Sequence, residues 1–128
     1  MCIRDRAYSG QISPGTSTDT ESWNGTNWTE VNNMNAGRQG LVGVGSAGNT
    51  AALAIGGETS PGADQASTEE WNGVSWVEVA DISTARAYLG GAGTTTAGIV
   101  MGGNTGSVSA ATEEWSGSSN TTKTVSTD

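Results

Sequence analysis

The alternation of apolar and polar positions is clearest over residues 68–79, where it predicts a β-hairpin. Two alternating runs flank Asn72-Gly73. Asn-Gly between such runs favours a two-residue type I′ turn, because both central residues then need positive φ. We therefore expect Trp71 to face Val74 across the hairpin, with Trp71 and Trp76 on the same face of the sheet.

This hairpin pattern recurs along the chain. It is present at residues 20–31 and, in its first half, at residues 112–119. The spacing is 48 residues from Trp23 to Trp71 and 44 residues from Trp71 to Trp115. Self-similarity at such a period indicates one supersecondary unit stacked against copies of itself.

Each full unit is predicted to contain four short strands. The second strand in each is a continuous apolar run, as expected for a strand that is buried on both faces. The predicted strands are residues 38–45, 51–55, 67–71 and 74–79 in one unit, and 86–93, 97–101, 110–115 and 119–125 in the next.

Three features accompany the strands in these units. An Arg opens the first strand, a Gly-Gly doublet closes the second, and Trp residues occupy the last two. The residues concerned are Arg38, Arg86, Gly56, Gly57, Gly102, Gly103, Trp23, Trp28, Trp71, Trp76 and Trp115. This pattern resembles the kelch repeat, the blade unit of the kelch and galactose-oxidase β-propellers, and is similar to tandem kelch-like repeats of environmental and phage-derived proteins.

The resemblance implies an all-β fold, a partial β-propeller of four-stranded antiparallel blades. The chain would hold about two and a half blades. Residues 7–35 would form the last two strands of a partial blade, residues 36–83 a full blade, and residues 84–128 a blade with a degraded last strand. Asn120 stands where that last strand would carry its Trp. We expect either a fragment of a longer repeat protein or copies that associate through open blade edges.

Residues 1–6 match nothing downstream and are interpreted as a non-native leader. They contain Cys2, the single cysteine of the chain, and lack the apolar core of a secretory signal. The cysteine content therefore permits either a reducing or an oxidising location.

Charge and hydropathy limit the possible partners. The chain has 13 acidic and 5 basic residues, a net charge of −8. This balance argues against nucleic acid, because phosphate backbones are bound by clustered basic surfaces. The sequence has no apolar run of about 18 residues, so we expect no membrane span.

Catalysis is poorly supported by the residues present. The chain contains no His, which removes the commonest general base and a common metal ligand, and no cofactor or metal site is predicted. The copper chemistry of oxidases in the resembled superfamily is excluded because it requires His. Glu69 and Glu70 are adjacent on a strand and point to opposite faces, so they cannot act as a pair. Glu21, Glu69 and Glu113 are interpreted as structural. Glu21 is expected opposite Trp28 and Glu69 opposite Trp76, where a carboxylate can accept from an indole or a backbone N–H.

The tryptophans and glycine doublets allow two interpretations each. Indole faces could stack on sugar rings, but recurrence at fixed positions favours packing between blades. The doublets could suggest a phosphate loop, but they lack a following helix pattern and a Lys. We favour close backbone approach or positive φ at the doublets.

The candidate binding rim consists of the loops at residues 58–66 and 104–110, which differ in length between the repeats. Loops at the rim of a propeller tolerate insertions and contact partners, although a solvated loop without a partner is an equal alternative. The candidate rim residues are Glu58, Thr59, Asp64, Gln65, Asn104 and Thr105.

These observations favour a non-enzymatic module for binding or adhesion, with a protein or a glycan as ligand and an extracellular or virion surface as location. An alternative is a fragment of a glycan-active propeller enzyme whose catalytic residues lie in missing blades. An intracellular adaptor is a third possibility, but it would need a further oligomerisation domain. Fold resemblance alone does not select among them, because propellers host many unrelated activities.

Overall fold

The computed structural model describes residues 5–45, 50–117 and 120–121, and these residues form an all-β protein. No helix occurs in these ranges, which confirms the predicted fold class. Every strand pairing is antiparallel. The strands form three sheets and one small hairpin.

Each sheet is built in a simple order. The first sheet contains β1 (Asp5–Ile12), β2 (Gly15–Trp23) and β3 (Trp28–Val31). The second contains β4 (Val42–Gly45), β5 (Ala52–Ile55), β8 (Thr68–Trp71) and β9 (Trp76–Val79), with the hairpin β6 (Glu58–Thr59) and β7 (Ala63–Asp64) inserted between β5 and β8. The third contains β10 (Gly90–Gly93), β11 (Gly98–Met101), β12 (Thr112–Trp115) and β13 (Asn120–Thr121).

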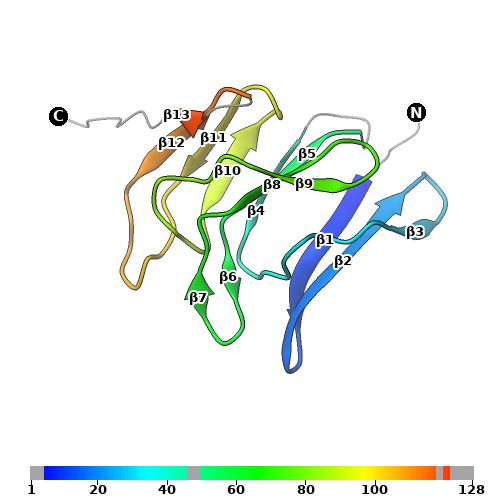
Figure 1. The fold of residues 1–128 in the computed structure, drawn as a ribbon, viewed down its shortest axis with the longest axis horizontal. Helices are drawn as coiled ribbons and strands as arrows, with labels where there is room; N and C mark the ends of the chain where they lie inside the picture. Colours follow the sequence, from blue (N-terminus) through cyan, green and yellow to red (C-terminus); the bar gives the residue numbers. More distant parts are fainter. Residues whose placement is uncertain (1–4, 46–49, 118–119, 122–128) are drawn as a thin grey trace.

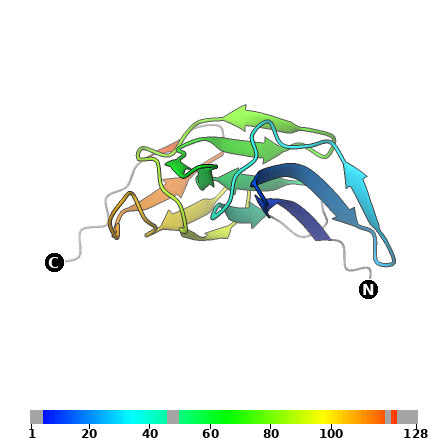
Figure 2. The same cartoon turned by 90° about the horizontal axis from the view of Figure 1, so that it is seen from below.

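The three sheets stand side by side as an open array (Figure 1). The second sheet lies between the first and the third, and the view from below shows the same order (Figure 2). Strands β4 and β10 are neighbours across the gap between the second and third sheets. The array does not close, and it is consistent with part of a β-propeller.

The second and third sheets each contain the four predicted strands, but these strands begin at later residues than predicted. Residues 38–41 were predicted to be part of a strand, but β4 begins at Val42, and β10 likewise begins at Gly90 rather than at residue 86. The reason is that Arg38 and Arg86 turn into the core instead of extending a sheet. Of the predicted last strand 119–125, only β13 falls within the described residues.

The first sheet differs from the two strands predicted for residues 7–35. It has three strands, and β1 includes Asp5 and Arg6, which were predicted to belong to a non-native leader. Residues 1–4 of that leader lie outside the described ranges. Strand β1 takes the position of β5, and β2 the position of β8, so the first sheet lacks a counterpart of β4.

The turn predicted at Asn72-Gly73 is wrong in type and in register. Trp71 pairs with Trp76 rather than with Val74. Gly73 has φ +100°, whereas Asn72 does not have the positive φ that a type I′ turn would require. The Asn72 Oδ1 instead accepts from the backbone N–H groups of Val74 and Ser75, both at 2.9 Å. This side-chain cap moves the tip of the hairpin one residue along.

The turn at Asn24 repeats this arrangement. Asn24 Oδ1 accepts from the N–H groups of Thr26 and Asn27, and Trp23 pairs with Trp28. The register error moves each cross-strand partner by two residues, which preserves the face on which every side chain lies. The face shared by Trp71 and Trp76 was therefore predicted correctly.

Two apolar clusters hold the sheets together. Trp71 and Trp76 pack between the first and second sheets with Met34, and Tyr8 borders them. Leu53, Ile55, Val100 and Trp115 pack between the second and third sheets. Strand β5 is therefore covered on both faces, as its continuous apolar run predicted. The same prediction is wrong for β11, which exposes Ile99 and Met101 because no further sheet of the described residues covers that face.

Candidate functional site

The connections between the second and third strands of each sheet project toward one edge of the array (Figure 1). We call this edge the rim and define it by residues 11–15, 58–65 and 104–109. The β1–β2 turn and the β6–β7 hairpin are its neighbouring tips. The loops predicted to form a binding rim belong to this edge.

A groove of about 530 Å³ lies between the first two tips. One wall comes from the first sheet and the other from the β6–β7 hairpin with Gln39. Its lining residues are Gln11, Ile12, Ser13, Pro14, Gly15, Gln39, Glu58, Ser60, Pro61 and Gly62.

Glu58 is the charged group of this groove, and two side chains hold its carboxylate. Gln39 Nε2 and Tyr88 Oη both donate to Glu58 Oε1 at 2.6 Å. The backbones of Gln39 and Glu58 also bond to each other at 2.8 and 2.9 Å. Neither side-chain bond uses Oε2, so that oxygen remains an acceptor.

The same contacts shift the ionisation of both groups. The hydrogen bond from Tyr88, followed by that from Gln39, holds the pKa of Glu58 below its ordinary value. The bond to Glu58 raises the pKa of Tyr88 above its ordinary value. At neutral pH the pair is therefore a carboxylate accepting from a neutral phenol.

Tyr88, which donates to Glu58, has an unusual backbone conformation. Its φ is +55°, and its side chain is 62% exposed. The repeat places Gly40, with φ +61°, at the equivalent position. A bulky side chain in the left-handed region is uncommon and points to a site under functional constraint. The sequence signal for this residue was a Tyr at the position where the other repeat has Gly40, and it was not recognised.

The predicted rim residues divide between two neighbouring tips. Of the predicted set, Glu58 alone lines the groove. Glu58 and Thr59 lie on β6, and Asp64 lies on β7 opposite Glu58, so this segment is a hairpin rather than the loop we expected. Gln65 follows β7, and its Nε2 donates to the carbonyl of Ala63 at 2.9 Å.

Asn104 and Thr105 lie on the third tip, away from the groove lining. Asn104 occupies the position equivalent to Glu58, and its backbone pairs with Ala87. Its Oδ1 accepts from the N–H of Gly106 at 2.7 Å. Gln11 and Gln39, which do line the groove, were not predicted because they lie outside the length-variable loops.

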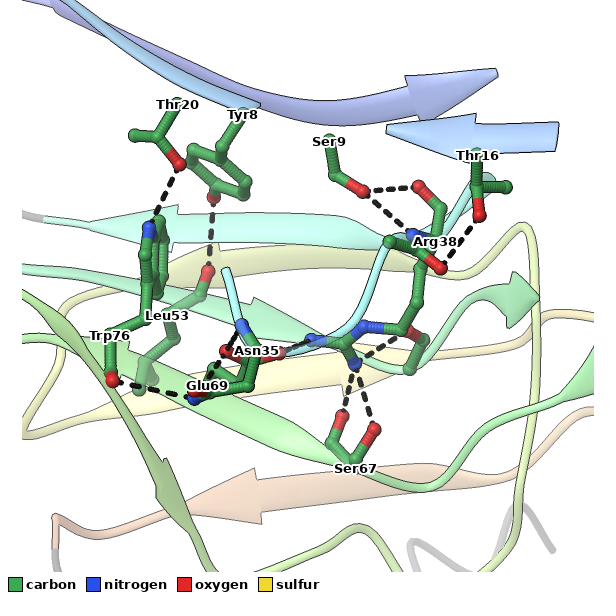
Figure 3. A network of polar contacts seen from close by, with 12 residues as sticks. Tyr8, Ser9, Thr16, Thr20, Asn35, Arg38, Leu53, Ser67, Glu69 and Trp76 are labelled. Atoms are coloured by element: carbon green, nitrogen blue, oxygen red, sulfur yellow. Dashed lines mark hydrogen bonds and ion pairs between the residues drawn. The ribbon is translucent and has the colours of Figure 1, made fainter. Parts of the chain in front are cut away.

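Arg38 and Arg86 belong to buried structural networks rather than to the groove. Arg38 Nη2 pairs with Glu69 Oε1 at 3.0 Å, and its Nη1 donates to the carbonyls of Gly56 and Ser67 (Figure 3). Burial lowers the pKa of Arg38, and the charge of Glu69 opposes this effect. Arg86 repeats the arrangement with Glu113 at 2.8 Å.

Glu69 accepts from a backbone N–H group, one of the two kinds of donor predicted for it, and Glu113 does the same. Glu69 Oε2 accepts from the N–H of Asn35, and Glu113 Oε2 from that of Ser83, both at 2.8 Å. The corrected register places Glu69 opposite Glu78 instead of Trp76, and Glu21 opposite Glu30 instead of Trp28. Trp76 Nε1 donates to Thr20 Oγ1 at 3.0 Å (Figure 3).

The glycine doublets directly follow β5 and β11, and the doublet after β5 lies where the third sheet approaches the second. Gly56 and Gly57 have φ +63° and +94°, and Gly102 and Gly103 have φ +68° and +99°. A Cβ on Gly56 would stand 2.7 Å from the Arg86 carbonyl oxygen, so the third sheet leaves no room for a side chain there.

The five tryptophans occupy two environments. Trp71, Trp76 and Trp115 are buried between sheets. Trp23 is half-buried and Trp28 is exposed, at one end of the array.

No protein-family model matches the chain, and no curated protein sequence matches it. Across the described ranges, no group of three or more His, Cys, Asp or Glu side chains could hold a metal ion. A helix of sufficient length and hydropathy to cross a membrane is also absent from those ranges.

Proposed function

We propose that the protein is a non-enzymatic, kelch-like β-propeller module that captures a protein or a glycan at its rim. The observation that carries this proposal is the polar groove between the β1–β2 and β6–β7 tips, with the Glu58 carboxylate held in place at its wall. Preorganised acceptors reduce the ordering cost of binding. The recurrence of the unit supports the propeller assignment.

The chemistry of the groove favours a ligand rich in hydrogen-bond donors. Glu58 accepts through Oε2, while Gln11 and Gln39 supply amide groups that donate and accept. The net charge of −8 disfavours an anionic partner, because like charges slow encounter and raise its cost. A neutral polyhydroxylated glycan or a segment of protein with exposed N–H or cationic groups fits these groups.

Replacing Glu58 by Gln should abolish capture while leaving the fold intact. The substitution keeps the size of the side chain and removes the charged acceptor, while the two backbone hydrogen bonds between residues 39 and 58 do not depend on that side chain and should hold β6 in place. Ligands found on glycan and peptide arrays with the parent chain would be measured by titration calorimetry. Thr105→Ala on the neighbouring tip is the matched control and should bind as the parent does. Undiminished binding by Glu58→Gln would refute the groove as the site.

The pKa of the Glu58 carboxyl should rise when Tyr88 is replaced by Phe. Because the folded-state pKa of Glu58 is lowered, its carboxylate and any stability from it are retained above the unfolded value and lost as pH falls through the folded pKa. Titration of the Glu58 carboxyl by ¹³C NMR should give a midpoint below that of an ordinary Glu side chain in the parent. Tyr88→Phe removes the largest cause of the shift, so the midpoint should rise. An unchanged midpoint would show that the Tyr88 bond is not made in solution.

A further inference from the structure

The two ends of the array present faces that are buried elsewhere in the same chain. At one end, Trp23 and Trp28 lie on the outer face of the first sheet with ring centroids 5.4 Å apart. They are the equivalents of Trp71 and Trp76, whose centroids are 5.6 Å apart. Trp76 is 5% exposed, whereas Trp28 is 48% exposed. The difference arises because the first sheet covers Trp76 and no preceding sheet covers Trp28 among the described residues.

The other end presents the complementary aliphatic face. Ile99 and Met101 on β11 are the equivalents of Leu53 and Ile55 on β5. Leu53 and Ile55 are 0% and 2% exposed beneath the third sheet, whereas Ile99 and Met101 are 37% and 43% exposed. The burial pattern of β11 alternates for this reason, although its sequence matches that of β5 in character.

A backbone contact accompanies each internal junction. Gly10 N–H donates to the Arg38 carbonyl at 3.0 Å between the first and second sheets, and Gly57 N–H donates to the Arg86 carbonyl at 2.8 Å between the second and third. Gly103 is the equivalent residue of the third sheet. A Cβ at Gly102 would meet only the Ser109 carbonyl at 3.6 Å, so the space that Arg86 fills beside Gly56 is open there.

We infer that a second copy of this chain docks head to tail, with the Trp23–Trp28 face of one copy against the Ile99–Met101 face of the other. At both internal junctions the tryptophan face of one sheet packs against apolar side chains of the preceding sheet, Tyr8 and Val31 at the first and Leu53 and Ile55 at the second. One end of the array therefore presents a tryptophan face, and the other end presents the apolar face that such tryptophans cover. The two faces differ, so the interface is heterologous and leads to a ring if it closes or to a longer array if it does not. This inference concerns the ends of the array and does not depend on ligand capture at the rim.

The experiment uses one variant for each face of the full chain. Trp28→Asp and Met101→Asp each place a charge on one exposed end, so circular dichroism should show folds like that of the parent. In sedimentation velocity at micromolar concentration, the parent should associate and each variant alone should remain a monomer. Their equimolar mixture should form a heterodimer, because one copy retains the aliphatic face and the other retains the tryptophan face.

Val108→Asp is the matched control, since Val108 is 93% exposed and lies on the rim, away from both end faces. It should associate as the parent does. If an Asp variant loses its strand signal, Trp28→Ser or Met101→Ser takes its place. A monomeric parent, association of either variant alone, or a mixture that stays monomeric would each overturn the head-to-tail interface.

Discussion

Glu69→Ala is expected to destabilise the fold by about 3–5 kcal/mol, the usual cost of removing one partner of a buried ion pair. The Arg38 and Glu69 side chains are 0% and 2% exposed. Removing the carboxylate leaves the guanidinium buried without its counter-charge. It also removes the acceptor of the hydrogen bond donated by the Asn35 backbone N–H. Urea unfolding followed by circular dichroism would measure the change.

Glu21 provides the matched control for this prediction. It stands at the equivalent position of the first sheet but is exposed, and neither ion pair of the described residues includes it. Glu21→Ala should therefore change stability by about 0.5 kcal/mol or less. Equal effects of the two substitutions would show that the buried pair does not hold the second sheet. A double replacement of Arg38 and Glu69 by Met should recover part of the loss, because no charge then remains buried.

Trp76→Ala is expected to cost about 3–5 kcal/mol, the range for truncation of a buried Trp. Its ring packs edge-on against Tyr8 at 4.7 Å and Trp71 at 5.6 Å between centroids. The substitution opens a cavity between the first and second sheets and leaves Thr20 Oγ1 without the indole donor. The effect should appear as a lower urea midpoint with little change in slope.

Trp28→Ala is the control that distinguishes the effect of burial between sheets from the effect of the local hairpin sequence. Trp28 follows the same type of turn and pairs with the equivalent Trp23, yet it is half exposed. In protein dilute enough to be monomeric, Trp28→Ala should cost well under half of the Trp76 effect. A loss of less than about 0.5 kcal/mol at Trp76 itself would mean that the first sheet does not cover it in solution.

The strand class and the faces of the hairpins followed from sequence because they depend on local periodicity. Side chains alternate between the two faces of a strand, so a register shift of two residues leaves each side chain on the same face. The incorrect turn therefore did not change the prediction that Trp71 and Trp76 share a face. The prediction of the turn type was wrong because the Asn72 side chain accepts hydrogen bonds from the turn backbone. The presence of Asn-Gly in the sequence does not reveal these bonds.

The candidate site was predicted only in part, since residues distant in sequence create it. Glu58 was chosen from a loop that varies in length, but its partners Gln39 and Tyr88 lie 19 and 30 positions away. The groove needs the β1–β2 tip of one sheet beside the β6–β7 tip of the next. No local sequence pattern predicts the distance between these two tips, because that distance depends on how the sheets are rotated relative to each other.

The sequence by itself determined the repeated unit, the burial of β5 on both faces and the alternation that places Trp71 and Trp76 on one face. Tertiary structure alone decided that Arg38 leaves the strand to meet Glu69, that Tyr88 reaches Glu58, and that Trp28 is exposed where Trp76 is buried. The physical reason is that strand periodicity is a property of neighbouring residues, whereas burial depends on whether another sheet stands against the face.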